Sequence, residues 1–320
     1  MRLDTTGVTT YDCRQAFAEE LIRLARSDPR IVAVCNDSVG SSNLAGFRTE
    51  FPDRLINVGI AEQDLVGVGA GLANGGLIPF VSAAAPFLTG RALEQIKADV
   101  AYSRAHVVLC GQSPGLAYGE LGPTHHSIED LSWLRAVADL PIVVPADPGQ
   151  TRAVVRWAAN HDGPSYLRIG RHPVPALGPD EQEFELGQSV QLREGRDVAV
   201  LAAGGMVSRA LEAAAFLDTV GVSTQVLNMV SIEPLDTVAV LRAAELTGRI
   251  VTVEEATVTG GLGASVATIL AQNRPTPMRI LGVPRTFAPT GGTDFLLAQF
   301  GLDADGIASA VRELCADVRS

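Results

Sequence analysis

The sequence predicts an α/β protein of two domains, each built on a mostly parallel sheet flanked by helices. Short apolar or β-branched runs alternate with helix-periodic stretches from about Tyr11 onward. A stretch rich in Pro, Gly and acidic residues, from His172 to Gly187, interrupts this alternation. The chain has 320 residues, of which 47% are hydrophobic, which is enough for two cores. We therefore expect domains at 8–172 and 189–320 with a linker at 173–188.

The first domain shows alternating strand and helix patterns. Strands are expected at 31–34, 54–58, 77–81, 106–110, 142–145 and 166–169, and helices at 16–25, 62–74, 89–103 and 149–160. The helix at 62–74 contains Gly67, Gly69 and Gly71. Each Gly weakens a helix by up to about 1 kcal/mol, so we expect close packing against another surface to compensate.

The second domain repeats the pattern, with strands expected at 197–202, 223–227 and 249–254 and a helix at 208–220. Its Gly260-Gly261-Leu262-Gly263 turn is of a kind that can cradle a phosphate before a helix. The chain contains neither GxGxxG nor a Walker sequence, however, so a purely structural turn is the better interpretation.

Composition narrows the class of protein. The net charge of −11 and the lack of a Lys and Arg cluster argue against nucleic acid or an anionic membrane as the main partner. Residues 1–10 lack the pattern of a leader, and no apolar run reaches about 18 residues, so we expect a soluble, cytoplasmic protein. The scattered cysteines predict reduced thiols rather than disulfides or a metal site, and they are Cys13, Cys35, Cys110 and Cys315.

A run of motifs carries the functional signal. Asn57-Val58-Gly59-Ile60-Ala61-Glu62-Gln63 places an acid at the start of a helix, directly after a strand. Considered alone, such an acid most often only complements the helix dipole. Further along, the chain has Ala70-Gly71-Leu72-Ala73, Pro79-Phe80, Gly119-Glu120-Leu121-Gly122-Pro123-Thr124-His125, Pro145-Ala146-Asp147-Pro148, Gly163-Pro164-Ser165 and Gly301-Leu302-Asp303-Ala304-Asp305-Gly306-Ile307. In this order and spacing, from about residue 10 to the C-terminus, the sequence resembles the C-terminal half of the transketolase family.

The resemblance implies thiamine diphosphate as the cofactor and a set of residues that bind its aminopyrimidine. Glu62 matches the glutamate that hydrogen-bonds N1′, a task for which a carboxyl with a pKa raised by burial would be suited. Phe87 matches the aromatic residue that packs on the ring, although a core Phe is the alternative interpretation. Asp37 matches an aspartate that supports the cofactor site, with a loop acid or helix cap as the alternative. Ile60, beside Glu62 in the motif, is also expected at the cofactor.

The resemblance also implies a substrate side. His125 matches a histidine that contacts the sugar oxygens and can move protons. Arg171 matches an arginine on the substrate phosphate, and Ser42 a hydroxyl that shares this contact. Arg168 is the alternative arginine, whereas His126 is expected to be structural.

Three positions depart from the family pattern. Leu121 stands where transketolases have an aspartate that reads a substrate hydroxyl, Ser113 replaces a histidine, and Ala84 replaces a second aromatic residue. Leu121 and Ser113 are expected to line the substrate site in these altered forms. Loss of an acid that hydrogen-bonds a substrate hydroxyl can change the discrimination between substrates with and without that hydroxyl by orders of magnitude. We therefore expect an unusual donor or acceptor for the two-carbon ketol transfer that the resemblance implies.

The diphosphate-binding half is not encoded here. The chain lacks Gly-Asp-Gly followed downstream by Asn, the signature that the family uses for diphosphate and metal. The resemblance therefore implies a partner subunit that holds the diphosphate and Mg²⁺ or Ca²⁺, in an α2β2 assembly with the active site between the two kinds of chain. Alone, this chain is expected to be inactive.

Three alternatives stay open. The β subunit of a 2-oxoacid dehydrogenase or acetoin-type enzyme shares the architecture, the glutamate and a partner chain. A 1-deoxyxylulose 5-phosphate synthase-like reaction is disfavoured because that family keeps both halves in one chain. A non-catalytic subunit would explain the departures, but Glu62, Phe87, His125 and Arg171 are retained against it.

Overall fold

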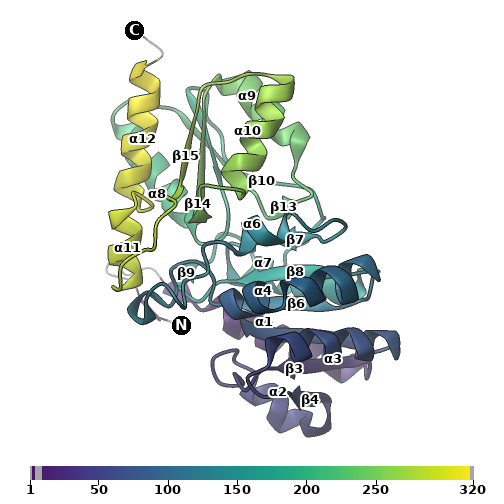
Figure 1. The fold of residues 1–320 in the computed structure, drawn as a ribbon. Coiled ribbons are helices and arrows are strands. Elements are labelled where there is room, and N and C mark those ends of the chain that lie inside the picture. Colours follow the sequence, from purple (N-terminus) through teal and green to yellow (C-terminus); the bar gives the residue numbers. More distant parts are fainter. Residues whose placement is uncertain (1, 4–8, 318–320) are drawn as a thin grey trace.

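Two sheets, one in each half of the chain, confirm the predicted α/β class (Figure 1). They are seen in a computed structural model that describes residues 2–3 and 9–317. The first sheet has seven strands in the order β13-β7-β8-β6-β5-β3-β4. In that order they span Ser231–Glu233, Ile142–Val143, Ser165–Ile169, Val108–Gln112, Ile78–Ala84, Ile31–Cys35 and Leu55–Asn57. All neighbouring strands are parallel except β13 and β7.

Helices cover both faces of the first sheet. One face packs against α1 (Cys13–Ser27), α2 (Ala45–Glu50) and α7 (Pro148–Asn160). The other packs against α3 (Glu62–Asn74), α4 (Ala85–Arg91), η2 (Ile96–Tyr102) and α6 (Asp130–Leu134). This arrangement follows from the apolar stripes of the helices and the nearly continuous burial of the parallel strands.

The second sheet has five strands in the order β10-β12-β11-β14-β15. They span Val190–Arg193, Thr224–Asn228, Val198–Ala202, Ile250–Thr257 and Met278–Val283. One face carries α8 (Met206–Thr219) and α12 (Ala304–Asp317), and the other carries α9 (Thr237–Thr247) and α10 (Leu262–Asn273). A short helix, α11 (Thr293–Gln299), precedes α12 and lies near the first half of the chain (Figure 1).

The two halves of the chain are more interleaved than the sequence predicts. Strand β13 comes from the second half but adds an antiparallel edge to the first sheet, opposite β7. A three-stranded sheet joins β1 (Arg2–Leu3), β2 (Thr9–Tyr11) and β9 (Val174–Pro175), so the expected linker also contributes a strand. Strand β13 was missed because three residues carry too little pattern to predict a strand.

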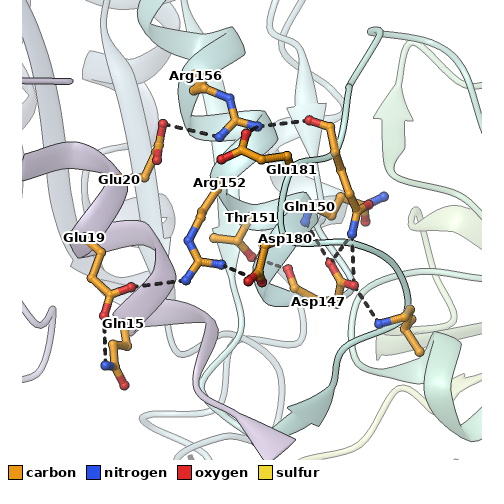
Figure 2. Close-up of polar contacts among 12 residues, drawn as sticks. Gln15, Glu19, Glu20, Asp147, Gln150, Thr151, Arg152, Arg156, Asp180 and Glu181 are labelled. Carbon is orange, nitrogen blue, oxygen red and sulfur yellow. Dashed lines mark hydrogen bonds and ion pairs between the residues drawn. The ribbon is translucent and has the colours of Figure 1, made fainter. Parts of the chain in front are cut away.

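The linker lies along the first domain, held by charged side chains (Figure 2). Arg152 on α7 pairs with Glu19 at 3.1 Å and with Asp180 of the linker at 3.5 Å. Arg156, one turn along α7, donates to the Gln182 carbonyl at 2.9 Å. The linker is therefore fixed against α1 and α7.

One expected helix is broken. Instead of a single helix at 89–103, the chain forms α4, a short α5 (Leu93–Gln95) and the π-helical η2. The backbone leaves helical geometry at Ala92, with φ −106° and ψ 22°. Buried apolar residues nevertheless recur every fourth position, at 88, 92, 96 and 100. The spacing of apolar residues therefore could not predict the break in the helix.

The Gly-rich turn has the structural role that the sequence favours. The Glu254 carboxylate accepts hydrogen bonds from the backbone N–H groups of Leu262 at 2.7 Å and Gly263 at 2.8 Å. A Cβ on Gly261 would lie 2.0 Å from Glu254 Oε2. A side-chain carboxylate of the protein itself thus fills the position at the start of α10 that a phosphate would need.

Within the described ranges, no helix is both long and apolar enough to cross a lipid bilayer.

Two glycines of α3 provide a matched stability test. A Cβ at Gly69 would lie 2.5 Å from Val81 Cγ2 of β5, whereas a Cβ at Gly71 would have nothing within 4 Å. Gly69→Ala is expected to lower the free energy of unfolding by about 1–3 kcal/mol through overpacking. Gly71→Ala should raise it by about 0.5–1 kcal/mol, because Ala loses less backbone entropy on folding. Urea denaturation of the two variants measures both, and equal effects would contradict this account of Gly69.

Candidate active site

The predicted cofactor residues meet at one edge of the first sheet. Asn36 and Asp37 follow β3, Asn57 ends β4, and Glu62 is the first residue of α3. The carboxyl ends of parallel strands lie at the same edge, which is where α/β proteins bind ligands. The topology therefore brings together residues that are 26 positions apart in the chain, Asn36 and Glu62.

The Glu62 side chain is buried and fully engaged, with only 3% exposure. Its Oε1 accepts a hydrogen bond from Asn36 Nδ2 at 2.8 Å, and both carboxylate oxygens lie 2.9 Å from Arg91 Nη1. Burial raises the pKa of Glu62, but the Arg91 hydrogen bond and charge, the Glu62 backbone N–H and Asn36 outweigh it, so the pKa is lowered. The expected raised pKa is therefore wrong for this chain by itself, because Arg91 stabilises the ionised form.

A network of short contacts shapes the loop before Glu62. Asn57 Oδ1 accepts hydrogen bonds from the backbone N–H groups of Asp37 at 2.9 Å and Gly59 at 3.0 Å. Asn57 Nδ2 donates to Asp37 Oδ1 at 3.0 Å. Gly59 has φ +75°, which favours glycine, and the turn leaves Ile60 78% exposed. Asp37 thus supports the loop, and Ile60 projects from it.

An aromatic and cationic series links the cofactor residues to the substrate residues. The Arg91 guanidinium lies 4.2 Å over the Phe87 ring, and Phe87 packs edge-on against His125 at 5.1 Å between centroids. His125 in turn packs against Tyr118 at 6.1 Å, and Arg171 lies 4.9 Å over the Tyr118 ring. These contacts bring Glu62, Phe87, His125 and Arg171 into one continuous site.

Arg171 also lines a polar cavity of about 360 Å³. A second arginine, Arg14, lines the same cavity, and its side chain donates to Asp12 and to the Ser41 carbonyl. His172 and Thr293 contribute to the wall. Asp12 lines the cavity too and pairs with Arg14 at 2.6 Å, so Arg171 is the guanidinium at this cavity that is suited to an anion such as a phosphate.

The other predicted substrate residues differ in accessibility. Leu121 is 56% exposed in a 3₁₀ turn, η3 (Gly119–Leu121), that leads to His125. Ser113 and Ser42 are buried, so this arrangement gives neither an open surface toward a substrate, and their substrate contacts stay a prediction. His126 is also buried, and its Nε2 lies 3.4 Å from the Gly119 carbonyl oxygen. Burial lowers the pKa of His126, which suits the expected structural role.

Arg168, the alternative phosphate residue, is buried in an ion pair. Its Nε lies 2.8 Å from Asp130 Oδ2, and its Nη2 donates to the carbonyls of Ser127 at 3.0 Å and Glu255 at 2.9 Å. Tyr166 also donates to Asp130, at 2.7 Å. Because its donors are occupied inside the protein, Arg168 is not placed to hold a substrate, and Arg171 is the better candidate.

The second half of the chain holds the segment that bears His125. Glu255 of β14 accepts a hydrogen bond from the Leu116 N–H at 2.7 Å, and Thr293 donates to the Leu116 carbonyl at 3.2 Å. The Gly291 N–H donates to the Gly119 carbonyl at 3.0 Å. The second half of the chain thus supports the segment that carries His125.

Among the described residues there is no group of three or more His, Cys, Asp or Glu side chains that could hold a metal. The four cysteines all lie in the described part of the chain and form no disulfide there. Burial raises the pKa of Cys13 to about 12 and also raises the pKa of Cys35 and Cys110.

Sequence reasoning missed four residues of this site: Asn36, Arg91, Tyr118 and Arg14. The spacing of Arg91, four residues after Phe87, was the signal available, since such pairs share a helix face. The partners of Glu62 and the wall of the anion cavity, by contrast, come from segments distant in the chain.

Known proteins resemble this chain over most of its length. Residues 9–175 match the family "Transketolase, pyrimidine binding domain", and residues 187–307 match "Transketolase, C-terminal domain". The chain is 44% identical over 302 residues to one of the subunits of the apulose-4-phosphate transketolase from Phocaeicola vulgatus, covering 94% of this chain and 96% of that one. It is 40% identical over 301 residues to the 6-deoxy-6-sulfo-D-fructose transketolase subunit SqwH of a Clostridium species, covering 94% of each.

A solved structure, described as a split gene transketolase in an inactive β4 tetramer, has a TM-score of 0.88 and 38% identity, covering 96% of this chain and 99% of that one. The chain therefore belongs to the transketolase family, in which it corresponds to the C-terminal subunit of the split enzymes.

Proposed function

We propose that this subunit transfers a two-carbon ketol unit from a ketose phosphate to an aldehyde or related acceptor, with thiamine diphosphate shared between it and a partner. The observation that carries the proposal is the continuous series from Glu62 through Phe87 and His125 to Arg171. This series supports the proposal because a carboxylate, an aromatic ring, an imidazole and a guanidinium follow one another along it, in the order that the reaction would need.

Glu62 and Phe87 fit the aminopyrimidine half of the cofactor. A buried carboxylate can share a proton with a ring nitrogen, and a half-buried aromatic ring can stack on a heterocycle. When bound, thiamine diphosphate supplies the carbanion and the electron sink that cleavage next to a ketone requires. Glu62 would keep a proton at N1′, with Asn36 orienting its carboxylate, while Ile60 would cover the ring.

On the substrate side, His125 would move protons to and from the sugar oxygens. Its pair of aromatic neighbours, Phe87 and Tyr118, fixes the ring between the cofactor residues and the anion cavity. Arg171 would bind the phosphate group in that cavity, and Arg14, already paired with Asp12, would contribute to its wall.

The partner subunit would supply the diphosphate site and its Mg²⁺ or Ca²⁺. Two relatives are named as single subunits of a transketolase, and the solved structure of β chains alone is described as inactive. Both facts support an α2β2 enzyme with the active site between the two kinds of chain.

We also propose the division into domains at 8–172 and 189–320, and a cytoplasmic location.

The donor and acceptor remain to be identified by assay. The two relatives are named for different substrates, a sugar phosphate and a sulfonated sugar, so family membership does not fix the choice. Exposed Leu121 offers an apolar contact where transketolases read a hydroxyl. We therefore propose a substrate that lacks, or presents differently, the hydroxyl beside the keto carbon.

Activity should require the partner. With thiamine diphosphate, Mg²⁺ and xylulose 5-phosphate or a less hydroxylated ketose, transfer is expected only from the mixture of this chain and an N-terminal subunit. A coupled assay with pyruvate as a competing donor checks this. Pyruvate consumption would favour the 2-oxoacid dehydrogenase branch, and activity of this chain alone would contradict the need for a partner.

Glu62→Gln should reduce turnover by the assembled enzyme at least about 10²-fold, because the amide cannot share a proton with N1′. The matched control is Asp64→Asn, which removes another acid from the first turn of α3, where Asp64 is exposed. Steady-state kcat of both variants provides the measurement. Similar losses would mean that Glu62 serves only the helix dipole.

Arg171→Ala should raise KM for a phosphorylated substrate about tenfold or more, because a charge-assisted hydrogen bond is lost. KM for the corresponding unphosphorylated substrate should change little. Arg274→Ala, which removes an exposed arginine at the end of α10, is the control. Equal increases in KM for both substrates would place Arg171 away from the phosphate.

A further inference from the structure

We propose that Arg91 occupies the aminopyrimidine site in the free subunit and must turn away before the cofactor can be seated. The inference rests on the proposed function of Glu62 and Phe87 and assigns a role to a residue outside the predicted site. In this role Arg91 is a built-in competitor of the cofactor.

Arg91 makes both contacts that the cofactor ring is proposed to make. Its Nη1 lies 2.9 Å from both oxygens of Glu62, the atoms proposed to bind N1′. Its guanidinium carbon lies 4.2 Å from the centroid of Phe87, the ring proposed to stack on the pyrimidine. A guanidinium is planar, donates hydrogen bonds and stacks on aromatic faces, so it imitates a protonated aminopyrimidine on both counts.

The two occupants exclude one another at Glu62. The Glu62 carboxylate is only 3% exposed, and its Oε1 already accepts a hydrogen bond from Asn36. Both oxygens also face Arg91. A ring nitrogen can therefore approach in hydrogen-bonding geometry only if the guanidinium withdraws.

Arg91 is placed so that it can withdraw. It is the last residue of α4, and its side chain is 50% exposed. An ion pair with one half-exposed partner is worth little in water, because solvent stabilises the cation when it leaves. The backbone of α4 and the Phe87 ring need not move for the side chain to turn outward.

The same contact changes the acid that the reaction would use. With Arg91 in place the pKa of Glu62 is lowered, which keeps the carboxylate ionised. Once the guanidinium leaves, burial becomes the main influence, and burial favours the protonated form. Displacement of Arg91 would thus both open the site and restore a carboxyl that can hold a proton.

The test measures cofactor affinity in the complex of this chain with its N-terminal partner. Calorimetric titration with thiamine diphosphate is expected to give a Kd about three- to tenfold lower for Arg91→Ala than for the wild type, because no competing state must be displaced. Arg91→Lys, which keeps the charge but loses the planar fork, should give a smaller decrease. An unchanged or higher Kd for Arg91→Ala would overturn the proposal, since a supporting residue would weaken binding when removed.

Arg26→Ala is the matched control. Arg26 is also an exposed arginine paired with a carboxylate, Glu50 at 2.6 Å, but it lies on α1, at the opposite face of the sheet from α4. Its loss should leave the Kd unchanged. An equal decrease would show a general effect of lost positive charge and would also overturn the proposal.

A second readout uses the free chain and needs no turnover. The carboxyl ¹³C shift of Glu62, followed through a pH titration, should give a low pKa in the wild type and a raised one in Arg91→Ala. Equally low values would overturn the inference about Arg91 while leaving the proposed function intact. A fully active Glu62→Gln enzyme would instead reject the proposed function.

Discussion

The buried ion pair between Arg168 and Asp130 holds together the parts of the structure on which the site depends. Both side chains are almost fully enclosed, at 5% and 0% exposure. A buried pair is tolerated only when its remaining hydrogen-bonding groups are satisfied. Here Tyr166 donates to Asp130, and Arg168 also donates to the carbonyls of Ser127 and Glu255. One network therefore ties β8 and α6 to β14 of the second sheet.

This junction connects the second half of the chain to the site proposed in the first. Residues 113–129 connect the end of β6 to α6 and carry His125. Glu255, Thr293 and the Gly291 backbone hold that connection at Leu116 and Gly119. The second half also supplies β13 to the edge of the first sheet. It supports the loop that carries His125 and contributes Thr293 to the wall of the cavity beside Arg171.

Sequence patterns predicted the parts of this arrangement that depend on neighbouring residues. The alternation of strands and helices was visible as periodicity, and Glu62 was predicted through the resemblance of its contiguous motif, residues 57–63, to the transketolase family. The direction of its pKa shift was not predictable, because it depends on Arg91, 29 positions away, returning to the same carboxylate. The anion cavity likewise needed Arg14 and Arg171 to be brought together by folding. The break at Ala92 was hidden because the apolar spacing continues across it.

Arg168 and Arg91 each neutralise a carboxylate, but they differ in how tightly they are held. Arg168 neutralises a carboxylate that never needs to be free, so it is enclosed and its donors are occupied. Arg91 neutralises a carboxylate that, in the proposed function, would later accept the cofactor, and it is half exposed and held by contacts that water can replace. In the proposed enzyme, this subunit would be made separately from the chain that holds the diphosphate and would fold before the cofactor arrives. A buried Glu62 without a partner would then cost stability. A movable arginine removes that cost while leaving the site available to the cofactor.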